Sequence, residues 1–83
     1  MTKDVRRLMW LRAGLRDGSA QRIRVEAQLS QGELAASAGV SRAAVSSWEQ
    51  LRRSPRGPAA LRYARLLQQL TAQHTPAQER PSA

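Results

Sequence analysis

Hydrophobic residues recur at helical spacing along most of the chain, and the residue types that favour strands form no runs. A helix with one apolar face is predicted between about Lys3 and Leu15. The face consists of Val5, Leu8, Leu11 and Leu15, and Met9 lies at its edge. Trp10 lies off this face. Gly18 marks the end of the segment, and Ser19 is predicted to cap the helix that follows.

Two shorter helices are predicted next. The first runs from about Ala20 to Gln28, with Ile23 and Ala27 on one face. The second begins after Ser30, because Ser30 and Glu33 have the spacing of a capping box, in which each residue satisfies a free backbone N–H. It is expected to end at Gly39, since glycine readily adopts the left-handed conformation that terminates helices.

Ser41 is predicted to cap a fourth helix, which ends near Gln50 or Leu51. A basic loop from Arg52 to Gly57 follows, and Pro58 suits the first turn of a fifth helix. The buried face of that helix is expected to comprise Leu61, Ala64, Leu67 and Leu70, with Tyr63 and Leu66 alongside. From about Thr71 onward, polar residues and prolines predict a flexible tail.

Residues 31–50 have the pattern of two short helices that meet at a tight turn. The first helix has an inner face of Leu34, Ala35 and Ala38; Gly39 makes the turn and Val40 fills it. Val45 and Trp48, three residues apart, are expected to attach the second helix to the core. This arrangement leaves four residues on the outer face of the second helix, namely Arg42, Ala43, Ser46 and Ser47.

This pattern resembles the Cro/C1-type (Xre-like) helix-turn-helix regulators of phages and bacteria. The matching stretches are LSQGELA at 29–35, AGVS at 38–41 and AVSSWE at 44–49. The resemblance implies an all-α, five-helix, lambda-repressor-like bundle with a central helix-turn-helix and an extra N-terminal helix. It divides the chain into an N-terminal amphipathic helix with its exit turn (1–18), a DNA-binding domain (19–70) and a tail (71–83).

The resemblance also implies that helix 41–50 reads the major groove of DNA. Arg42 is the best candidate base reader, because its guanidinium can pair with both acceptors of a guanine; a phosphate contact is the alternative. Ala43 or Ala44 is suited to contact a thymine methyl group, although both are equally well explained as helix formers. Ser46 and Ser47 are short hydrogen-bonding groups that specify bases weakly. Part of any specificity is therefore expected to come from DNA shape.

Backbone phosphates are expected to meet a second set of residues: Gln31, Ser41, Arg52, Arg53 and Arg56. Gln31 opens a helix whose N-terminus favours an anion, although it has a simpler interpretation as an exposed helix-start residue. Capping alone is enough to explain Ser41. The loop arginines would otherwise be an ordinary solvated surface. Arg24 and Glu49 match positions that pair in the family, so a structural ion pair is expected between them.

Composition restricts the function further. The chain has 83 residues and a formal net charge of +8, and all but one of its basic residues are arginines. This excess favours a polyanionic partner. There is no cysteine and a single histidine, His74, so a metal site lacks ligands. With neither a catalytic motif nor a cofactor motif, neither an enzyme nor a cofactor is predicted. No signal peptide or membrane span is recognisable, which favours a cytoplasmic, nucleoid-associated protein.

The leading interpretation is a transcriptional regulator, most simply a repressor, that binds an inverted-repeat operator in double-stranded DNA as a homodimer. The subunit interface is expected on either the last helix (Leu66, Leu67, Leu70) or the N-terminal helix, where Trp10 either anchors the interface or covers the edge of the core. The alternative is an antitoxin or adaptor protein whose N-terminal helix binds a protein partner. A third possibility is architectural or recombination-associated DNA binding dominated by arginine contacts.

Overall fold

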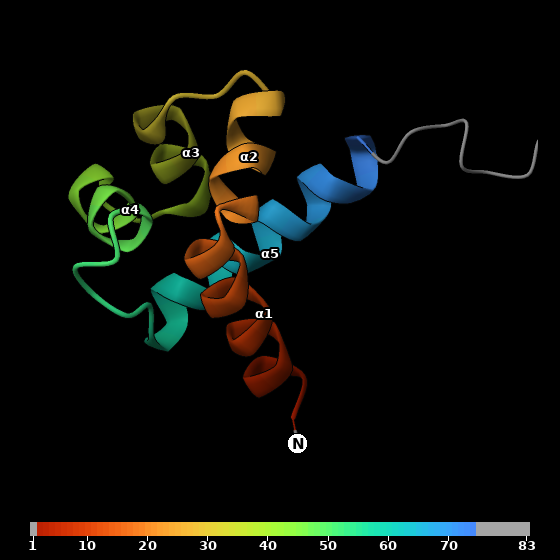
Figure 1. The fold of residues 1–83 in the computed structure, drawn as a ribbon, viewed down its shortest axis with the longest axis vertical. Helices are drawn as coiled ribbons and strands as arrows, with labels where there is room; N and C mark the ends of the chain where they lie inside the picture. The colour runs from red at the N-terminus through yellow and green to blue at the C-terminus, as the bar shows by residue number, and fades with distance from the viewer. Residues whose placement is uncertain (1, 75–83) are drawn as a thin grey trace, which may run out of the picture.

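The computed structural model describes residues 2–74, which form five helices and no strand. The helices are α1 (Lys3–Asp17), α2 (Ser19–Glu26), α3 (Gln31–Ala38), α4 (Arg42–Glu49) and α5 (Gly57–His74). In Figure 1, α3 and α4 lie together on one side of the molecule, and the long α5 runs behind α1 and α2. The predicted all-α five-helix bundle with an extra N-terminal helix is confirmed.

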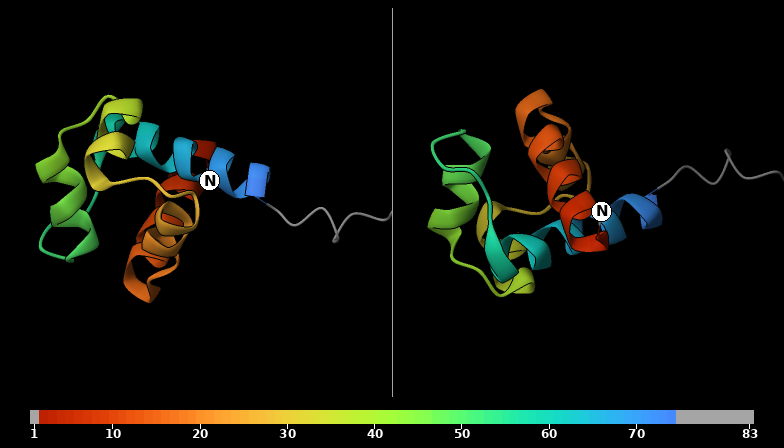
Figure 2. Two further views of the ribbon diagram at one scale, coloured as in Figure 1. Left: turned by 90° about the horizontal axis from the view of Figure 1, so that it is seen from above. Right: turned by 90° about the horizontal axis from the view of Figure 1, so that it is seen from below.

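All five helices contribute to one hydrophobic core. Helix α1 packs against α2 and α5, and α3 packs against α4 and α5. Figure 2 shows the resulting arrangement from above and below, with the start of α1 beside α5. The buried apolar side chains are Leu11, Leu15, Ala20, Leu34, Ala35, Ala38, Val45, Trp48, Ala60, Tyr63, Ala64 and Leu67. Val45 and Trp48 therefore attach α4 to the core, as their spacing predicts.

The junction between α1 and α2 differs from the prediction. Ser19 is the first residue of α2 and not its cap. A single left-handed residue, Gly18 with φ of 86°, turns the chain directly from one helix into the next, so no room remains for a separate capping serine. Asp17 supplies the missing acceptor instead: its Oδ1 accepts a hydrogen bond from the Ser19 backbone N–H at 2.8 Å. This bond lowers the pKa of the Asp17 carboxyl.

The ends of α3 and the start of α4 follow the predicted local chemistry. Ser30 and Glu33 form both bonds of the capping box, at 3.0 and 2.8 Å. Gly39 ends α3 in the left-handed conformation, with φ of 71°. Ser41 then caps α4 by accepting a hydrogen bond from the backbone N–H of Ala44 at 3.0 Å. These contacts fix the turn between α3 and α4.

Helix α5 buries Ala64 and Leu67 as predicted, but the rest of its buried face differs from the prediction. Ala60 and Tyr63 lie in the core, whereas Leu61 and Leu70 are only partly buried. Ala60 is fully buried, and Tyr63 packs beside Trp48, with ring centroids 5.2 Å apart. The helix also continues to His74, beyond the expected end at Leu70. The rest of the predicted tail, 75–83, lies outside the described residues.

Helix α1 is less buried than its apolar face suggests. Leu11 and Leu15 are in the core, but Val5 and Met9 are 44% and 52% exposed. Trp10 is partly buried and packs against the core, so it covers a core edge and is not the fully exposed anchor considered from the sequence. Leu8 in the same half of α1 also packs partly buried against the core, so only one side of this half is covered.

A buried ion pair joins α2 to α4. Arg24 donates Nε and Nη2 to the two carboxylate oxygens of Glu49, at 2.7 and 3.0 Å, and the side chains are 11% and 3% exposed. Arg24 also donates Nη1 to the carbonyl of Leu29 at 2.9 Å, and Glu49 accepts a second bond from Gln31 Nε2 at 2.9 Å. The bond to Glu49 raises the pKa of Arg24. The predicted ion pair is confirmed, and it extends to the start of α3.

Substitution Glu49→Gln should lower the free energy of unfolding by about 2–3 kcal/mol, because it leaves the Arg24 guanidinium largely buried without a counter-charge. Urea denaturation measures this change. Glu26→Gln, the same chemical change at an exposed position of α2, is the matched control and should shift stability by less than about 0.5 kcal/mol. Equal effects of the two substitutions would contradict a structural role for the pair.

Tyr63 combines deep burial with an unsatisfied hydroxyl. Its side chain is fully buried, and its Oη has no hydrogen-bond partner among the described residues. Burial raises the pKa of this phenol above its ordinary value of 10.0, with a smaller contribution from the charge of Glu49. The folded state therefore keeps the proton after the unfolded chain has lost it, and the stability that follows from the neutral phenol declines as the pH rises above 10.0.

Substitution Tyr63→Phe should raise the free energy of unfolding at pH 7 by about 1 kcal/mol, because it removes a desolvated hydroxyl without a partner. Above about pH 10 the unaltered protein should lose roughly 1.4 kcal/mol of stability per pH unit through Tyr63, and the variant should not show this loss. Urea denaturation at pH 7 and pH 11 checks both effects, and Tyr63 is the sole tyrosine of the chain. A destabilised Tyr63→Phe variant at pH 7 would contradict the prediction.

Candidate nucleic-acid interface

Helix α4 presents its N-terminal half to solvent. Arg42 and Ala43 are exposed, while Ser46 and Ser47 are only partly buried. The hydroxyl of Ser46 accepts a hydrogen bond from Gln50 Nε2 at 3.2 Å, so it is partly engaged within the helix. Because Val45 and Trp48 hold the opposite face in the core, the exposed face is fixed in orientation. Arg42 and Ala43 are therefore the most accessible of the four predicted base-reading residues.

A first hollow lies where α3 and α4 begin. It is lined by Arg24, Ser30, Gln31, Gly32 and Arg42, and we call it the N-terminal hollow. The first turn of a helix leaves backbone N–H groups without partners inside the helix, and these favour an anion. Gln31 is held at the hollow by its bond to Glu49. Two residues predicted for different roles, Gln31 and Arg42, are thus brought together.

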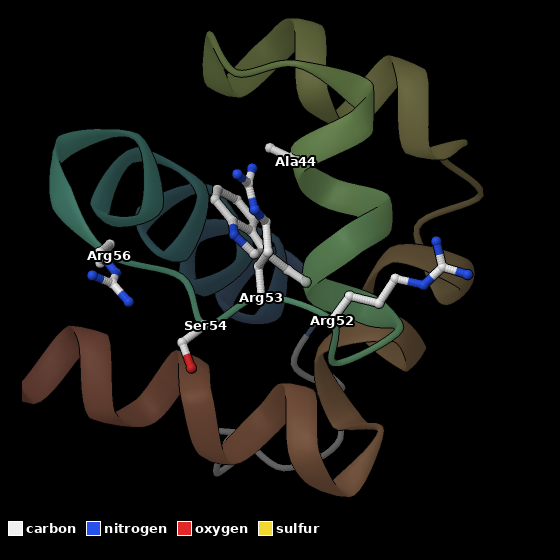
Figure 3. Close-up of a pocket in the computed structure, with 6 residues that line it drawn as sticks. Ala44, Arg52, Arg53, Ser54 and Arg56 are labelled. Carbon is white, nitrogen blue, oxygen red and sulfur yellow. The ribbon is translucent and has the colours of Figure 1, made fainter.

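A second hollow lies between α4 and the segment that follows it. Figure 3 shows this loop hollow, which is lined by Ala44, Trp48, Arg52, Arg53, Ser54 and Arg56. Arg52, Arg53 and Arg56 are all exposed, whereas Trp48 is buried beneath them. The three loop arginines predicted to bind phosphate therefore share one concave surface. The remaining predicted residues, Ser41, Ala43, Ser46 and Ser47, line neither hollow.

The charge at the two hollows has one sign. Five arginines line them, and no aspartate or glutamate does. Two carboxylates lie beside the N-terminal hollow: Glu33 accepts a hydrogen bond from the backbone N–H of Ser30 at 2.8 Å, and Glu49 has both oxygens bound by Arg24 and one of them also by Gln31. Arginine keeps its charge at any physiological pH and presents several donors in a rigid plane suited to phosphate. The surface around α4 is therefore built to attract a polyanion.

The loop hollow depends on Arg12 of α1, a residue that the sequence pattern does not distinguish. Pro55 is buried, although the residues on both sides of it are exposed. Its carbonyl accepts two hydrogen bonds from Arg12 of α1, from Nε at 3.2 Å and from Nη2 at 3.0 Å. No sequence signal distinguishes Arg12 from the other arginines of α1, because the contact spans 43 positions of the chain.

No helix in residues 2–74 is both long and apolar enough to cross a membrane. Comparison with curated proteins and with solved structures finds no significant match. A family model described as helix-turn-helix matches residues 21–73, which include most of α2, all of α3 and α4, and nearly all of α5. Helix α1 lies outside the match, in agreement with the resemblance found in the sequence. The chain therefore belongs to the helix-turn-helix family of DNA-binding regulators, of the Cro/C1 type.

Proposed function

We propose that this protein is a sequence-specific transcriptional repressor that inserts helix α4, with its cap at Ser41, into the major groove of double-stranded DNA. One observation carries the proposal: the exposed N-terminal half of α4 lies beside two arginine-lined hollows without acidic residues. A helix of this kind enters the groove while flanking positive groups contact the phosphates. A protein bound at an operator then excludes polymerase from an overlapping promoter.

Base reading is assigned mainly to Arg42. Its side chain is exposed on the first turn of α4, and its guanidinium can donate to both O6 and N7 of a guanine. The exposed methyl group of Ala43 suits a thymine methyl, and Ser46 and Ser47 supply weak hydrogen bonds. Because few groups read bases directly, DNA shape supplies the rest of the specificity.

Affinity is assigned to the two hollows. Gln31 and the helix N-terminus beside it take a phosphate at the N-terminal hollow, and Ser41 lies at the start of the neighbouring helix. Arg52, Arg53 and Arg56 take phosphates at the loop hollow. Each phosphate neutralised by an arginine releases condensed counterions, so binding should weaken steeply as the salt concentration rises.

A homodimer on an inverted repeat is the simplest assembly, because two copies double the contacts and match the two-fold symmetry of such a site. This function places the protein with the nucleoid in the cytoplasm. An antitoxin or adaptor role is the second candidate, and one observation favours it: Val5 and Met9 are exposed one turn apart on α1, outside the family match. Selection of bound sites from random DNA separates the two, since only the first predicts an enriched palindrome.

Substitution Arg42→Ala should raise the dissociation constant for a selected DNA site about 10- to 100-fold, as expected for the loss of a guanine contact worth about 1–3 kcal/mol. Binding to random DNA should weaken much less. Fluorescence anisotropy with both duplexes measures the difference. Arg65→Ala, at an exposed arginine of α5 outside both hollows, is the control. Equal losses on both duplexes would reassign Arg42 to phosphate.

Substitution Arg53→Ala should weaken binding to all sequences alike, because its proposed partner is a phosphate. The slope of log affinity against log salt concentration should become shallower by about 0.9. Titrations at four or more salt concentrations give this slope. An unchanged slope, with the same Arg65→Ala control, would place Arg53 outside the interface.

A further inference from the structure

The middle of the arginine loop is tied to the fold by α1. Within the described chain, residues 53–55 form no backbone–backbone hydrogen bond. The last such bonds before them are those that close α4, made by the N–H groups of Leu51 and Arg52. The side chain of Arg12 fills this gap by donating two hydrogen bonds to the carbonyl of Pro55. A residue from outside the family match thus holds the centre of the loop.

The chemistry of this contact suits a fixed position. Proline has no N–H, so the carbonyl is the only polar group of the Pro55 backbone, and it lies in a buried residue. A guanidinium offers parallel donors in one rigid plane and can meet both lone pairs of that oxygen. Hydrogen bonds from a charged donor are also stronger than neutral ones. Loss of Arg12 would leave this buried carbonyl without its donors and would release the loop.

We propose that Arg12 is a positioning residue for DNA binding, which holds the arginine loop in the conformation that receives a phosphate. The inference rests on the function proposed above. Arg12 does this without contacting DNA: by ordering the loop before binding, it removes the entropy cost of ordering it on the DNA. Helix α1 is therefore part of the DNA-binding unit of this chain, although it lies outside the helix-turn-helix itself.

Arg7 provides a matched control on the same helix. It is partly buried like Arg12, carries the same charge, and donates Nε to Gln68 Oε1 of α5 at 3.0 Å. Its substitution also removes one positive charge and one long-range contact of α1. Because Gln68 lies in α5 and not in the loop, Arg7→Ala reports what α1 contributes to the fold in general.

The experiment compares the unaltered chain with Arg12→Ala, Arg12→Lys and Arg7→Ala. NMR relaxation of the backbone amides of Arg53, Ser54, Arg56 and Gly57 measures the order of the loop, and anisotropy measures affinity for a selected DNA site. Arg12→Ala should lower the order parameters of these amides from about 0.85 to below about 0.6 and raise the dissociation constant about 5- to 20-fold. Arg12→Lys, which keeps the charge and the aliphatic stem but not the planar fork, should lie in between. Arg7→Ala should leave the loop order parameters near about 0.85 and change the dissociation constant by less than about 2-fold.

Three outcomes would overturn the inference. Equal effects of Arg7→Ala and Arg12→Ala would show that α1 acts only through general stability. Weaker DNA binding by Arg12→Ala with unchanged loop order parameters would make Arg12 a direct phosphate contact. Lower loop order parameters with unchanged affinity would separate the loop from DNA binding. If the unaltered chain enriches and binds no DNA, the proposed function itself fails, and that result is distinct from these three because it precedes any substitution.

Discussion

One interaction connects α2 with both helices of the helix-turn-helix: the partly buried ion pair between Arg24 and Glu49. Arg24 of α2 donates to the Glu49 carboxylate at the end of α4 and to the Leu29 carbonyl before α3. The same carboxylate accepts a hydrogen bond from Gln31, the first residue of α3. Helices of eight residues are too short to be stable alone, so contacts of this kind must hold α3 and α4 in place. The same pair holds Gln31 at the N-terminal hollow and neutralises the carboxylate of Glu49.

The surplus of arginine serves two different purposes. Some arginines hold the fold by donating to backbone carbonyls: Arg12 donates to the carbonyl of Pro55 in the loop, and Arg62 donates to the carbonyls of Ala38 and Gly39 at the end of α3. Others, such as Arg42 and Arg53, remain exposed at the hollows. The first group of arginines supports a small core, and the second group supplies positive charge that attracts DNA. One residue type therefore contributes to both stability and function.

Much of the fold could be predicted because its signals are local. The capping box at Ser30, the glycine at 39 and the cap at Ser41 act over three or four residues, so their spacing alone specifies them. Predictions failed where neighbours in space decide. Ser19 has the chemistry of a cap, but the turn at Gly18 leaves it inside α2. Periodicity favoured Leu61 for the core, yet the packing of α5 against the other helices buries Ala60 and Tyr63.

The sequence by itself determined the helices, the turn between α3 and α4, and the family to which the chain belongs, because all of these follow from residue types at short, fixed spacing. It also placed Arg42 on the outer face of its helix. Only the tertiary structure decided which arginines line a hollow and which donate hydrogen bonds that stabilise the fold. The contact of Arg12 with Pro55 shows the reason: two segments 43 residues apart become neighbours only when all five helices pack around one core.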